Sequence, residues 1–339
     1  MTQTDSTRWQ QPIDATGTTR MDILRKRHVI KKAVRAYLDQ QGFTEIDSPL
    51  LVRGTTPDIA VESFQVGDRY LATSTEYQMK RLAVGGFKRI YSLTQNFRLG
   101  DTGTAFRNPE FTMLEWGRVG ERMAQIEQDL ENMLTAAMQA LGITDQLTYQ
   151  GRSIDMRAPW PRRSVAEVMQ QASGITVKEF DSPTLLAVAQ ALNIELRQDW
   201  LRDGDFLFSL IMDTIQPTLG TDKPIFIIEW PIAQTASAEM DADTNRAVRS
   251  ELFVGGVELA DGFAGLADAS MQEQLFAYMQ AKRAANKQQA VQIDTRYLQA
   301  VREANITGAG MAMGFDRLVM LLTNQSEIRN TLAFGWDEV

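Results

Sequence analysis

The chain has 339 residues, 44% of them hydrophobic, so it can bury a substantial core in one large domain or two small ones. It has no cysteine and a single histidine, which excludes disulfides, thiolate nucleophiles, cysteine-ligated zinc and most histidine-based triads. The formal net charge of -8 argues against a broad nucleic-acid surface, although it leaves room for a local basic patch. Any chemistry in this chain must therefore use arginine, glutamate, aspartate and the backbone.

The N-terminal part is predicted to hold a tail, a helix and a strand. Residues 1–20 lack the apolar core of a signal peptide, so we expect a flexible tail. Apolar residues at helical spacing predict a helix over 21–41 that ends at Gly42, and a strand follows over 43–51, where Pro49 favours an edge position. Nowhere do about 18 apolar residues run together, so we expect no membrane span and a cytoplasmic protein.

The remaining elements predict an α+β domain over residues 21–339. Strands are expected at 70–74, 90–98, 110–116, 224–230, 251–260 and 308–314. Helices are expected at 75–84, 123–141, 164–171, 183–192, 206–215 and 271–285. The middle of the chain, about 121–217, is therefore predicted to be a helical insertion. Strands before and after this helical block predict a mainly antiparallel sheet rather than alternating βαβ units.

The long hairpin at 90–116 carries the first candidate site. Period-two geometry puts Phe111, Met113 and Glu115 on one face of its returning strand. Phe111 could stack on a flat base and Glu115 could hold an ammonium, while Arg98 on the partner strand could bridge a carboxylate and a phosphate. The alternative is a half-buried strand with a structural arginine–glutamate pair.

A second candidate site lies at a predicted two-residue hairpin turn, Gly255-Gly256. In that register Phe253 pairs with Glu258, and Glu251 becomes the diagonal neighbour of Glu258 on the same face. Two carboxylates about 7–8 Å apart at the backbone could close around a hard cation that carries nucleotide phosphates, and magnesium is the natural candidate. The alternative is two solvated glutamates.

The third candidate is the segment 308–318, where small residues permit close backbone approach before a helix begins. It lacks the βαβ context and the acidic residue of a dinucleotide site. Arg317, at the start of this apolar helix, could meet the terminal phosphate of ATP. By contrast, Met79-Lys80-Arg81 is predicted to be a solvated helix face.

In their order along the chain, these constellations resemble the motifs of class II aminoacyl-tRNA synthetases. Within that class the chain is most similar to the lysyl branch and its compact elongation factor P-lysine (β-lysine) ligases, which lack an anticodon-binding domain. The resemblance runs from about Met21 to Phe334. It is carried by the segments 73–82, 108–116, 226–231, 251–263 and 314–322.

The resemblance implies roles for individual residues. Arg98 would bridge the amino-acid carboxylate and the α-phosphate, Phe111 would stack on adenine, and Arg317 would contact the γ-phosphate, which makes the two arginines the catalytic candidates. Glu251 and Glu258 would hold Mg²⁺. Further nucleotide-binding positions are Gly100, Arg107, Asn108, Leu259 and Gly314. The amino-acid site would comprise Ser74, Glu76 for the substrate amine, Glu115 for a distal ammonium, Gly117, Asp261 and Gly265.

The resemblance also implies the activity. Such ligases form an aminoacyl-adenylate from ATP and pass the acyl group, by preference β-lysine, to a lysine side chain of elongation factor P. With no anticodon-binding domain expected, an acceptor other than tRNA is favoured. Motif 1 implies a homodimer that uses the first helix and the strand through Pro49.

Two alternatives stay open. One is a ligase of specialised metabolism with a different amino acid and a different amine or carrier acceptor. The other is a catalytically silent paralogue that serves as a sensor or scaffold. Retention of the four charged residues Arg98, Glu251, Glu258 and Arg317 argues against silence.

The chain departs from the family at the amino-acid pocket and in the hairpin loop. Where the family reads Asn-Gly-Phe-x-Glu-Leu, an aspartate (Asp261) replaces the amide and Gly265 replaces a substrate-facing glutamate. Gly117 replaces a tyrosine, so the pocket is expected to suit a bulkier or less cationic amino acid. In the loop, Arg107 replaces a histidine, and Asp101 could replace a missing glutamate.

Overall fold

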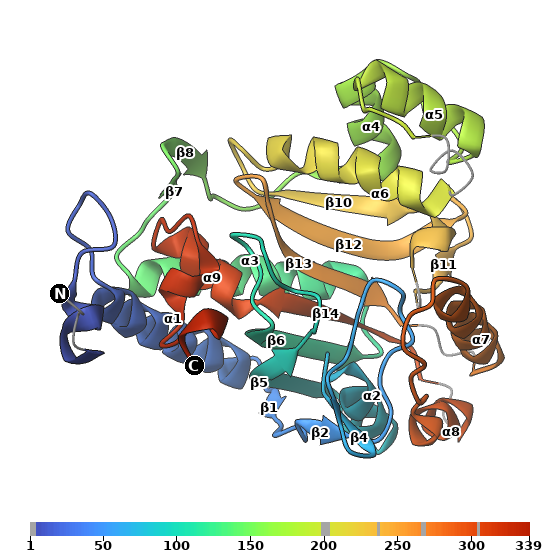
Figure 1. Cartoon of the computed structure of the whole chain (residues 1–339), viewed down its shortest axis with the longest axis horizontal. Coiled ribbons are helices and arrows are strands. Elements are labelled where there is room, and N and C mark those ends of the chain that lie inside the picture. Colours follow the sequence, from blue (N-terminus) through green and yellow to red (C-terminus); the bar gives the residue numbers. More distant parts are fainter. Residues whose placement is uncertain (1–4, 198–203, 236–237, 266–268, 304–305) are drawn as a thin grey trace.

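A nine-stranded, mainly antiparallel sheet lies at the centre of the molecule (Figure 1). The computed structural model describes residues 5–197, 204–235, 238–265, 269–303 and 306–339. In spatial order the sheet comprises β1 (Thr44–Glu45), β5 (Arg89–Phe97), β6 (Glu110–Val119), β14 (Gly308–Gly314), β13 (Val257–Ala264), β12 (Arg246–Val254), β10 (Ile225–Trp230) and β9 (Arg162–Ser164), with β11 (Met240–Asp241) paired to β12. The end pairs β1/β5 and β9/β10 are parallel, and the other pairs are antiparallel. The predicted α+β class is confirmed.

Helices cover both faces of this sheet, and each face has its own core. The first face, here called the α1 face, packs against α1 (Arg20–Gln40), α3 (Met123–Ala140) and α9 (Phe315–Leu322). The opposite face, here called the cavity face, is covered at the β10 end by α4 (Val165–Ser173), α5 (Ser182–Ala191) and α6 (Gly204–Ile215). On β12, Leu252 belongs to the first core and Phe253 to the second, as period-two alternation requires.

Further helices and small sheets lie beside the main sheet (Figure 1). At the other end of the cavity face are α2 (Glu76–Val84), α7 (Ala269–Ala285) and α8 (Thr295–Glu303). The small sheets are β2 (Leu51–Val52), β4 (Arg69–Leu71) and β3 (Gln65–Val66), and β7 (Gln146–Tyr149) with β8 (Arg152–Asp155). Short 3-10 helices are η1 (Asp5–Gln10), η3 (Gln216–Thr218), η4 (Ile232–Gln234), η5 (Ile328–Thr331) and η6 (Trp336–Glu338).

Most predicted elements are found within a few residues of their expected ends. The strand expected over 43–51 is wrong, because only β1 and β2 form there, at its two ends. Pro49, which has no amide hydrogen to donate, lies in the break between them. The strand character expected over 251–260 belongs to the hairpin β12/β13, whose predicted turn at Gly255-Gly256 and predicted pairing of Phe253 with Glu258 are confirmed.

The N-terminal segment contacts the C-terminal one. Residues 1–4 of the predicted tail lie outside the described residues. Trp9 Nε1 donates a hydrogen bond to the Ala333 carbonyl at 2.8 Å, and its ring packs edge-on against Phe334 with centroids 5.3 Å apart. Thr19 then caps α1 in a capping box with Asp22. The flexible tail, its boundary at residue 20 and the bounds of the insertion stay predictions.

None of the helices built from the described residues has the length and the hydrophobicity that a membrane crossing requires.

Candidate active site

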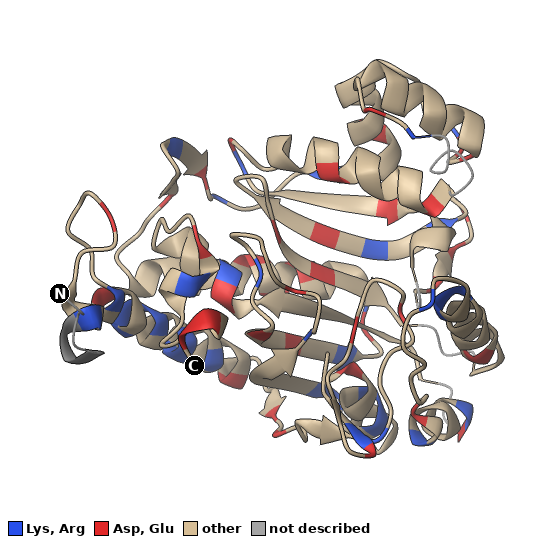
Figure 2. Ribbon diagram, viewed as in Figure 1, with Lys and Arg blue, Asp and Glu red and all other residues tan. Residues whose placement is uncertain are grey.

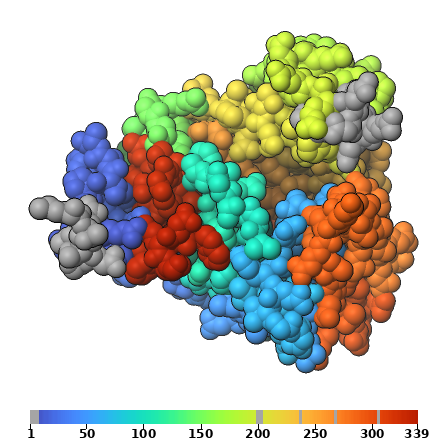
Figure 3. Space-filling model, in the orientation of Figure 1, coloured from blue at the N-terminus to red at the C-terminus, as the bar shows by residue number. Residues whose placement is uncertain are grey.

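A cavity of about 350 Å³ opens on the cavity face of the sheet, between β6, β13, β14 and the helices α2, α7 and α8. The surface is visibly hollowed between the yellow-green helical segment and the blue and orange segments (Figure 3). This volume is in the range of a small-molecule site. Sequence-predicted residues from separate stretches of the chain line it: Ser74, Glu76, Arg98, Glu115, Gly117, Asp261 and Gly265.

Arg98 brings a cation with spare hydrogen-bonding capacity to this cavity. It directly follows β5, and its amide donates to the Pro109 carbonyl at 2.9 Å, which fixes the base of the hairpin loop. Its guanidinium carbon lies 5.2 Å from the centroid of the Phe111 ring. Its Nε is buried and finds no hydrogen-bond partner in the described part of the chain. An anion in the cavity would satisfy this donor.

Arg317 projects from the first turn of α9 and joins three segments. Its Nη1 donates to the backbone carbonyl of Glu258 at 2.7 Å and lies 3.5 Å from the Glu258 carboxylate. Its Nε donates to the Phe106 carbonyl in the hairpin loop at 3.3 Å. A Cβ added to Gly314 would lie 3.4 Å from Arg317 Cδ, at contact distance from this side chain.

Asp316 anchors the same turn of α9. Its buried carboxylate accepts a hydrogen bond from the amide of Thr112 on β6 at 2.7 Å and forms an ion pair with Arg27 of α1. The Arg27 guanidinium also lies over the Phe315 ring, 5.0 Å from its centroid. Asp316 therefore sets the position from which Arg317 reaches the cavity face.

Three carboxylates share the cavity face of the β12/β13 hairpin. Glu251 lies opposite Asp261 and Phe253 lies opposite Glu258, because one extra residue, Leu259, interrupts the register between them. Acidic and basic residues stand next to each other on β12 (Figure 2).

Arg249 connects two of these carboxylates. Its Nη2 lies 2.6 Å from Glu251 Oε1, and its Nε lies 2.9 Å from Asp261 Oδ1. Burial raises the pKa of both carboxyl groups, and the Arg249 guanidinium opposes that rise.

The predicted magnesium pair has the right donor chemistry. Across the described residues, no group of three or more His, Asp or Glu side chains is placed to hold a metal ion. Glu251 and Glu258 nevertheless present carboxylate oxygens on one face, the donors that Mg²⁺ prefers when phosphate oxygens complete its shell. These two residues fit the ion together with a triphosphate, and the site stays a prediction.

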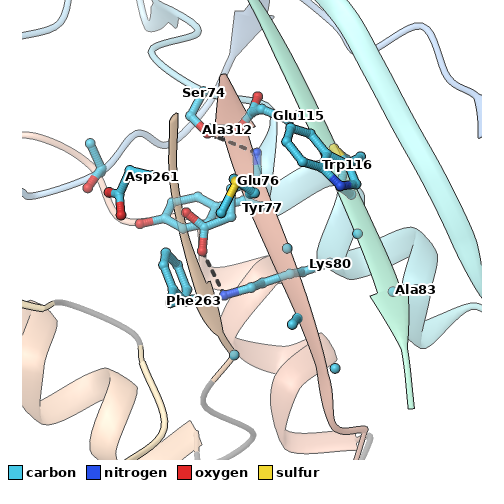
Figure 4. Close-up of a pocket in the computed structure, with 18 of the residues that line it drawn as sticks. Ser74, Glu76, Tyr77, Lys80, Ala83, Glu115, Trp116, Asp261, Phe263 and Ala312 are labelled. Carbon is cyan, nitrogen blue, oxygen red and sulfur yellow. Dashed lines mark hydrogen bonds and ion pairs between the residues drawn. The ribbon is translucent and has the colours of Figure 1, made fainter. Parts of the chain in front are cut away.

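Glu115 is already hydrogen-bonded by the chain. It accepts from Ser74 Oγ and from the amide of Thr75, both at 2.6 Å, and from the Thr75 hydroxyl. Burial raises the pKa of the Glu115 carboxyl, while these hydrogen bonds oppose the rise. Ser74 and Glu115 therefore both line the cavity and contact each other (Figure 4), and their role in substrate binding stays a prediction.

Lys80 is a functional candidate that sequence reasoning missed. The predicted solvated face is wrong for this residue, because Lys80 reaches from α2 into the cavity toward Glu76 (Figure 4). Its Nζ lies 2.6 Å from Glu76 Oε1, 5.1 Å from the Phe263 ring centroid and 5.8 Å from that of Tyr297. A glutamate and a lysine four residues apart usually mark an exposed helix face. Because Glu76 was predicted to bind the substrate, its neighbour Lys80 on the same face of α2 could have been predicted to reach the cavity as well.

The predicted loop residues Arg107 and Asn108 and the nearby Asp101 all have hydrogen-bond or ion-pair partners within the protein. Arg107 Nη1 lies 3.1 Å from Asp101 Oδ1, so Asp101 is paired within the loop. Asn108 donates to the Glu110 carbonyl at 2.6 Å and accepts from the Trp336 amide at 3.1 Å.

Two other predicted nucleotide-binding positions differ in exposure. Gly100 is exposed, and the side chain of Leu259 is buried in the core of the α1 face. Leu259 can therefore reach a nucleotide only through its backbone. The nucleotide-binding roles of Gly100, Leu259 and the loop residues stay predictions.

Comparison with known proteins identifies the family. The family model described as tRNA synthetases class II (D, K and N) matches residues 6–338. The lysine–tRNA ligase of Chloroflexus aurantiacus is 33% identical over 324 residues, which cover 93% of this chain and 65% of that protein. The elongation factor P–(R)-beta-lysine ligases of an Enterobacter species and of Erwinia tasmaniensis are 31% and 32% identical, and each alignment covers 93% of this chain and 95% of the relative.

The chain thus spans slightly less than two thirds of that lysine–tRNA ligase and nearly the full length of these elongation factor P ligases. All three relatives are ligases by name, in agreement with the predicted enzyme class. The predicted resemblance and the predicted fold are confirmed. On the match over residues 6–338, the chain belongs to the class II tRNA synthetases of the D, K and N type.

Proposed function

We propose that this protein is an ATP-dependent, AMP-forming amino acid ligase. The observation that carries the proposal is Arg98, whose buried Nε lacks a partner in the described structure while its guanidinium lies beside Phe111 at the cavity. A cation at this point can neutralise the carboxylate of an amino acid and the α-phosphate of ATP together. Its closeness to an aromatic ring suits a nucleotide whose base stacks on Phe111.

The reaction has two steps. In the first, a carboxylate oxygen of the amino acid attacks the α-phosphorus of ATP, and the bond from that phosphorus to the pyrophosphate oxygen breaks. In the second, an amine attacks the carbonyl carbon of the adenylate, AMP leaves, and the amine loses a proton. Arg98 orients the carboxylate and the α-phosphate, and Arg317 holds the terminal phosphate at the start of α9.

Magnesium fits the same scheme. Glu251 and Glu258 would hold Mg²⁺, which neutralises phosphate charge when bound. The contact of Arg317 with Glu258, at 3.5 Å, supports a common role of these two residues at the phosphate end of the proposed site.

For the acceptor we propose a lysine side chain of elongation factor P. The support is the near full-length match to two relatives named as elongation factor P ligases. A different amine is the second candidate, in a ligase whose amino acid also differs; the departures Gly117, Asp261 and Gly265 concern that amino acid. A homodimer and a cytoplasmic location belong to the same proposal.

The test is amino-acid-dependent exchange of labelled pyrophosphate into ATP, across a panel of α- and β-amino acids. We expect exchange with at least one amino acid, and its loss in the Arg98→Ala variant. Incubation with elongation factor P should then give a mass increase of one acyl group. Exchange without this mass increase would favour the second acceptor, and no exchange with any amino acid would favour a silent paralogue.

A further inference from the structure

One side of the cavity is formed by a segment outside the helices and strands, residues 56–62, here called the wall segment. Thr56, Asp58 and Val61 of this segment line the cavity. We infer that Arg283 of α7 is a positioning residue for amino-acid activation, because it fixes the wall segment against the cavity. The inference rests on the proposed function, since it concerns the amino-acid side of the same site.

Arg283 holds a turn in the wall segment from its buried side. The turn spans residues 58–61, and the Val61 amide donates to the Asp58 carbonyl at 3.2 Å. Arg283 is only 1% exposed, and its Nη1 donates to the carbonyls of Asp58 and Val61 at 2.8 and 3.0 Å. Its Nε donates to the Gln289 carbonyl at 3.0 Å, so the same guanidinium also fixes the chain that follows α7.

Among the described residues, the groups to which Arg283 donates are thus carbonyls without net charge, and its buried Nη2 finds no partner. Burial of a charged group without a carboxylate partner costs free energy, and an uncharged side chain could fill the same space. What the guanidinium adds is a set of charge-assisted hydrogen bonds, which are stronger than those between neutral groups. We therefore assign Arg283 to the geometry of the cavity and not only to the packing of α7.

A second side chain, close to the end of α7, supports the same turn. Gln288 Nε2 donates to the Ile59 carbonyl at 2.9 Å, and the Gln288 amide donates to the Arg283 carbonyl, also at 2.9 Å. Farther along, the Gln292 carbonyl accepts from the amide of Thr55, just before the wall segment, at 2.9 Å. The wall segment is therefore held by the chain that joins α7 to α8.

The wall segment also contacts the parts of the chain that present the proposed substrate-binding residues. The amide of Leu99, which directly follows Arg98, donates to the Glu62 carbonyl at 2.9 Å. At the other end of the segment, Thr56 hydrogen-bonds Tyr77 in the first turn of α2. A displacement of about 1 Å in a positioning group can cost about 100-fold in rate. Loss of the Arg283 contacts should therefore be visible in catalysis.

The first test compares Arg283→Met with the native chain in pyrophosphate exchange, with the amino acid of the panel that the native chain uses best. We expect KM for this amino acid to rise about 10-fold or more, and KM for ATP to change by less than about 2-fold. The reason is that none of the Arg283 partners belongs to the residues assigned to ATP. KM is independent of the fraction of folded enzyme, so partial unfolding cannot mimic this result. Equal rises of both KM values, or no change in either, would overturn the inference.

Two further variants keep the test decisive if Arg283→Met folds poorly. Gln288→Leu leaves Arg283 in place and removes the hydrogen bond to the Ile59 carbonyl, so KM for the amino acid should rise about 3-fold, the effect of one neutral hydrogen bond. Arg302→Met breaks the exposed ion pair with Glu273 between α8 and α7, and as the matched control it should leave both KM values unchanged. An equal rise in the two variants would show that any disturbance of α7 has this effect and would contradict the inference.

The conservative variant Arg283→Lys provides a rescue test. Lysine keeps the charge but lacks the planar fork that reaches three carbonyls. We expect its KM for the amino acid to lie between the values of the native chain and of Arg283→Met. A value equal to that of Arg283→Met would show that the charge-assisted hydrogen bonds are not what holds the wall segment.

Calorimetry separates this inference from the proposed function. If no amino acid of the panel supports exchange, the proposed ligase activity fails, and the native chain and Arg283→Met are titrated with the same panel. Binding of an amino acid about 10-fold more tightly by the native chain would support the positioning role of Arg283. Equal binding by the two proteins, or binding by neither, would overturn it.

Discussion

At the residue scale, the polar side chains of the cavity are of two kinds: some have a hydrogen-bond donor left without a partner in the described structure, and others are already paired within the chain. Arg98 has a buried donor left over for a ligand, whereas Lys80 and Glu115 already have partners within the chain. A residue of the first kind can be replaced with little loss of stability and a large loss of activity. A residue of the second kind couples activity to folding.

Arg98→Lys should therefore separate these effects. Lysine keeps the charge but loses the planar fork that can bridge two anions. We expect kcat/KM for exchange to fall about 100- to 1000-fold, the usual cost of one charge-stabilising donor, while the melting temperature stays within about 3 °C. Arg157→Lys, in an exposed pair with Asp155, is the matched control and should leave both values unchanged. A large fall in melting temperature for Arg98→Lys would assign Arg98 to the fold instead.

Glu115 gives a pH prediction. Because burial raises the pKa of its carboxyl in the folded state, its contribution to the free energy of unfolding is fully present below its ordinary pKa and is lost as pH rises through the folded pKa. Glu115→Gln cannot ionise, so the free energy of unfolding of the variant relative to native should increase from pH 4.5 upward. Urea unfolding between pH 4.5 and 8 measures this difference. A difference that is constant with pH, or that falls, would show that the hydrogen bonds to Ser74 and Thr75 outweigh burial.

Much of the residue-level site could be predicted, since the alternation of β6 places Glu115 and Gly117 on one face whatever the rest of the fold does. Lys80 could not be assigned from alternation or helical spacing alone. Its burial depends on Phe263 and Tyr297, which come from distant segments, β13 and α8. Tertiary neighbours of this kind leave no signal in a local pattern.

At the element scale, the start of α9 is held by a charge pair and not by a capping side chain. The helix has Gly314 at its N-cap and no side-chain cap hydrogen bond. Asp316 instead ties the first turn to the Thr112 amide of β6 and to Arg27 of α1. Three elements therefore meet at one carboxylate.

Removal of the Asp316 carboxylate should lower the free energy of unfolding. Asp316→Ala leaves Arg27 without its ion-pair partner, and we expect a loss of about 3–5 kcal/mol in the free energy of unfolding. Glu327→Gln, which breaks the exposed pair with Arg329, should cost at most about 1 kcal/mol. Denaturant unfolding of both variants measures the contrast, and similar values for the two would refute the anchoring role of Asp316.

Elements with a strong local signal were predictable, and those without one were not. β14 occupies 308–314 as predicted, and α2 differs from its prediction by one residue. β9 was not predicted, because it is three residues long and exists only by pairing with β10. α8 was not predicted either, although Tyr297, Leu298 and Val301 have the spacing of a buried helix face.

At the scale of the whole molecule, the sequence order of the strands is not their order in the sheet. β14, from the C-terminal part, lies between β6 and β13 in the centre. Helical insertions separate strands that end up as neighbours, so spacing along the chain carries no information on this order. The strand order was therefore not predicted, and the strands before and after the helical block predicted only the α+β class and a mainly antiparallel sheet.

The proposed homodimer can be tested at this scale. Leu50 and Leu51, beside Pro49, are 39% and 44% exposed in the single chain, and a subunit interface would cover them. Sedimentation should give about twice the chain mass of 38.1 kDa, and Leu51→Asp should shift the protein toward the monomer. An unchanged mass in Leu51→Asp, or a native monomer at micromolar concentration, would contradict the proposal.

The extra residue at Leu259 has a consequence for the proposed site. Side chains on a strand alternate between its two sides, so Glu258 and Asp261, an odd number of positions apart, would otherwise point in opposite directions. The extra residue puts both carboxylates on one side of the sheet, so the proposed phosphate end and the proposed amino-acid end of one ligand would face a single surface. A one-residue gap in this strand would destroy that arrangement without touching any charged residue. We therefore expect the extra residue, as well as the two acids, to be needed for the proposed activity.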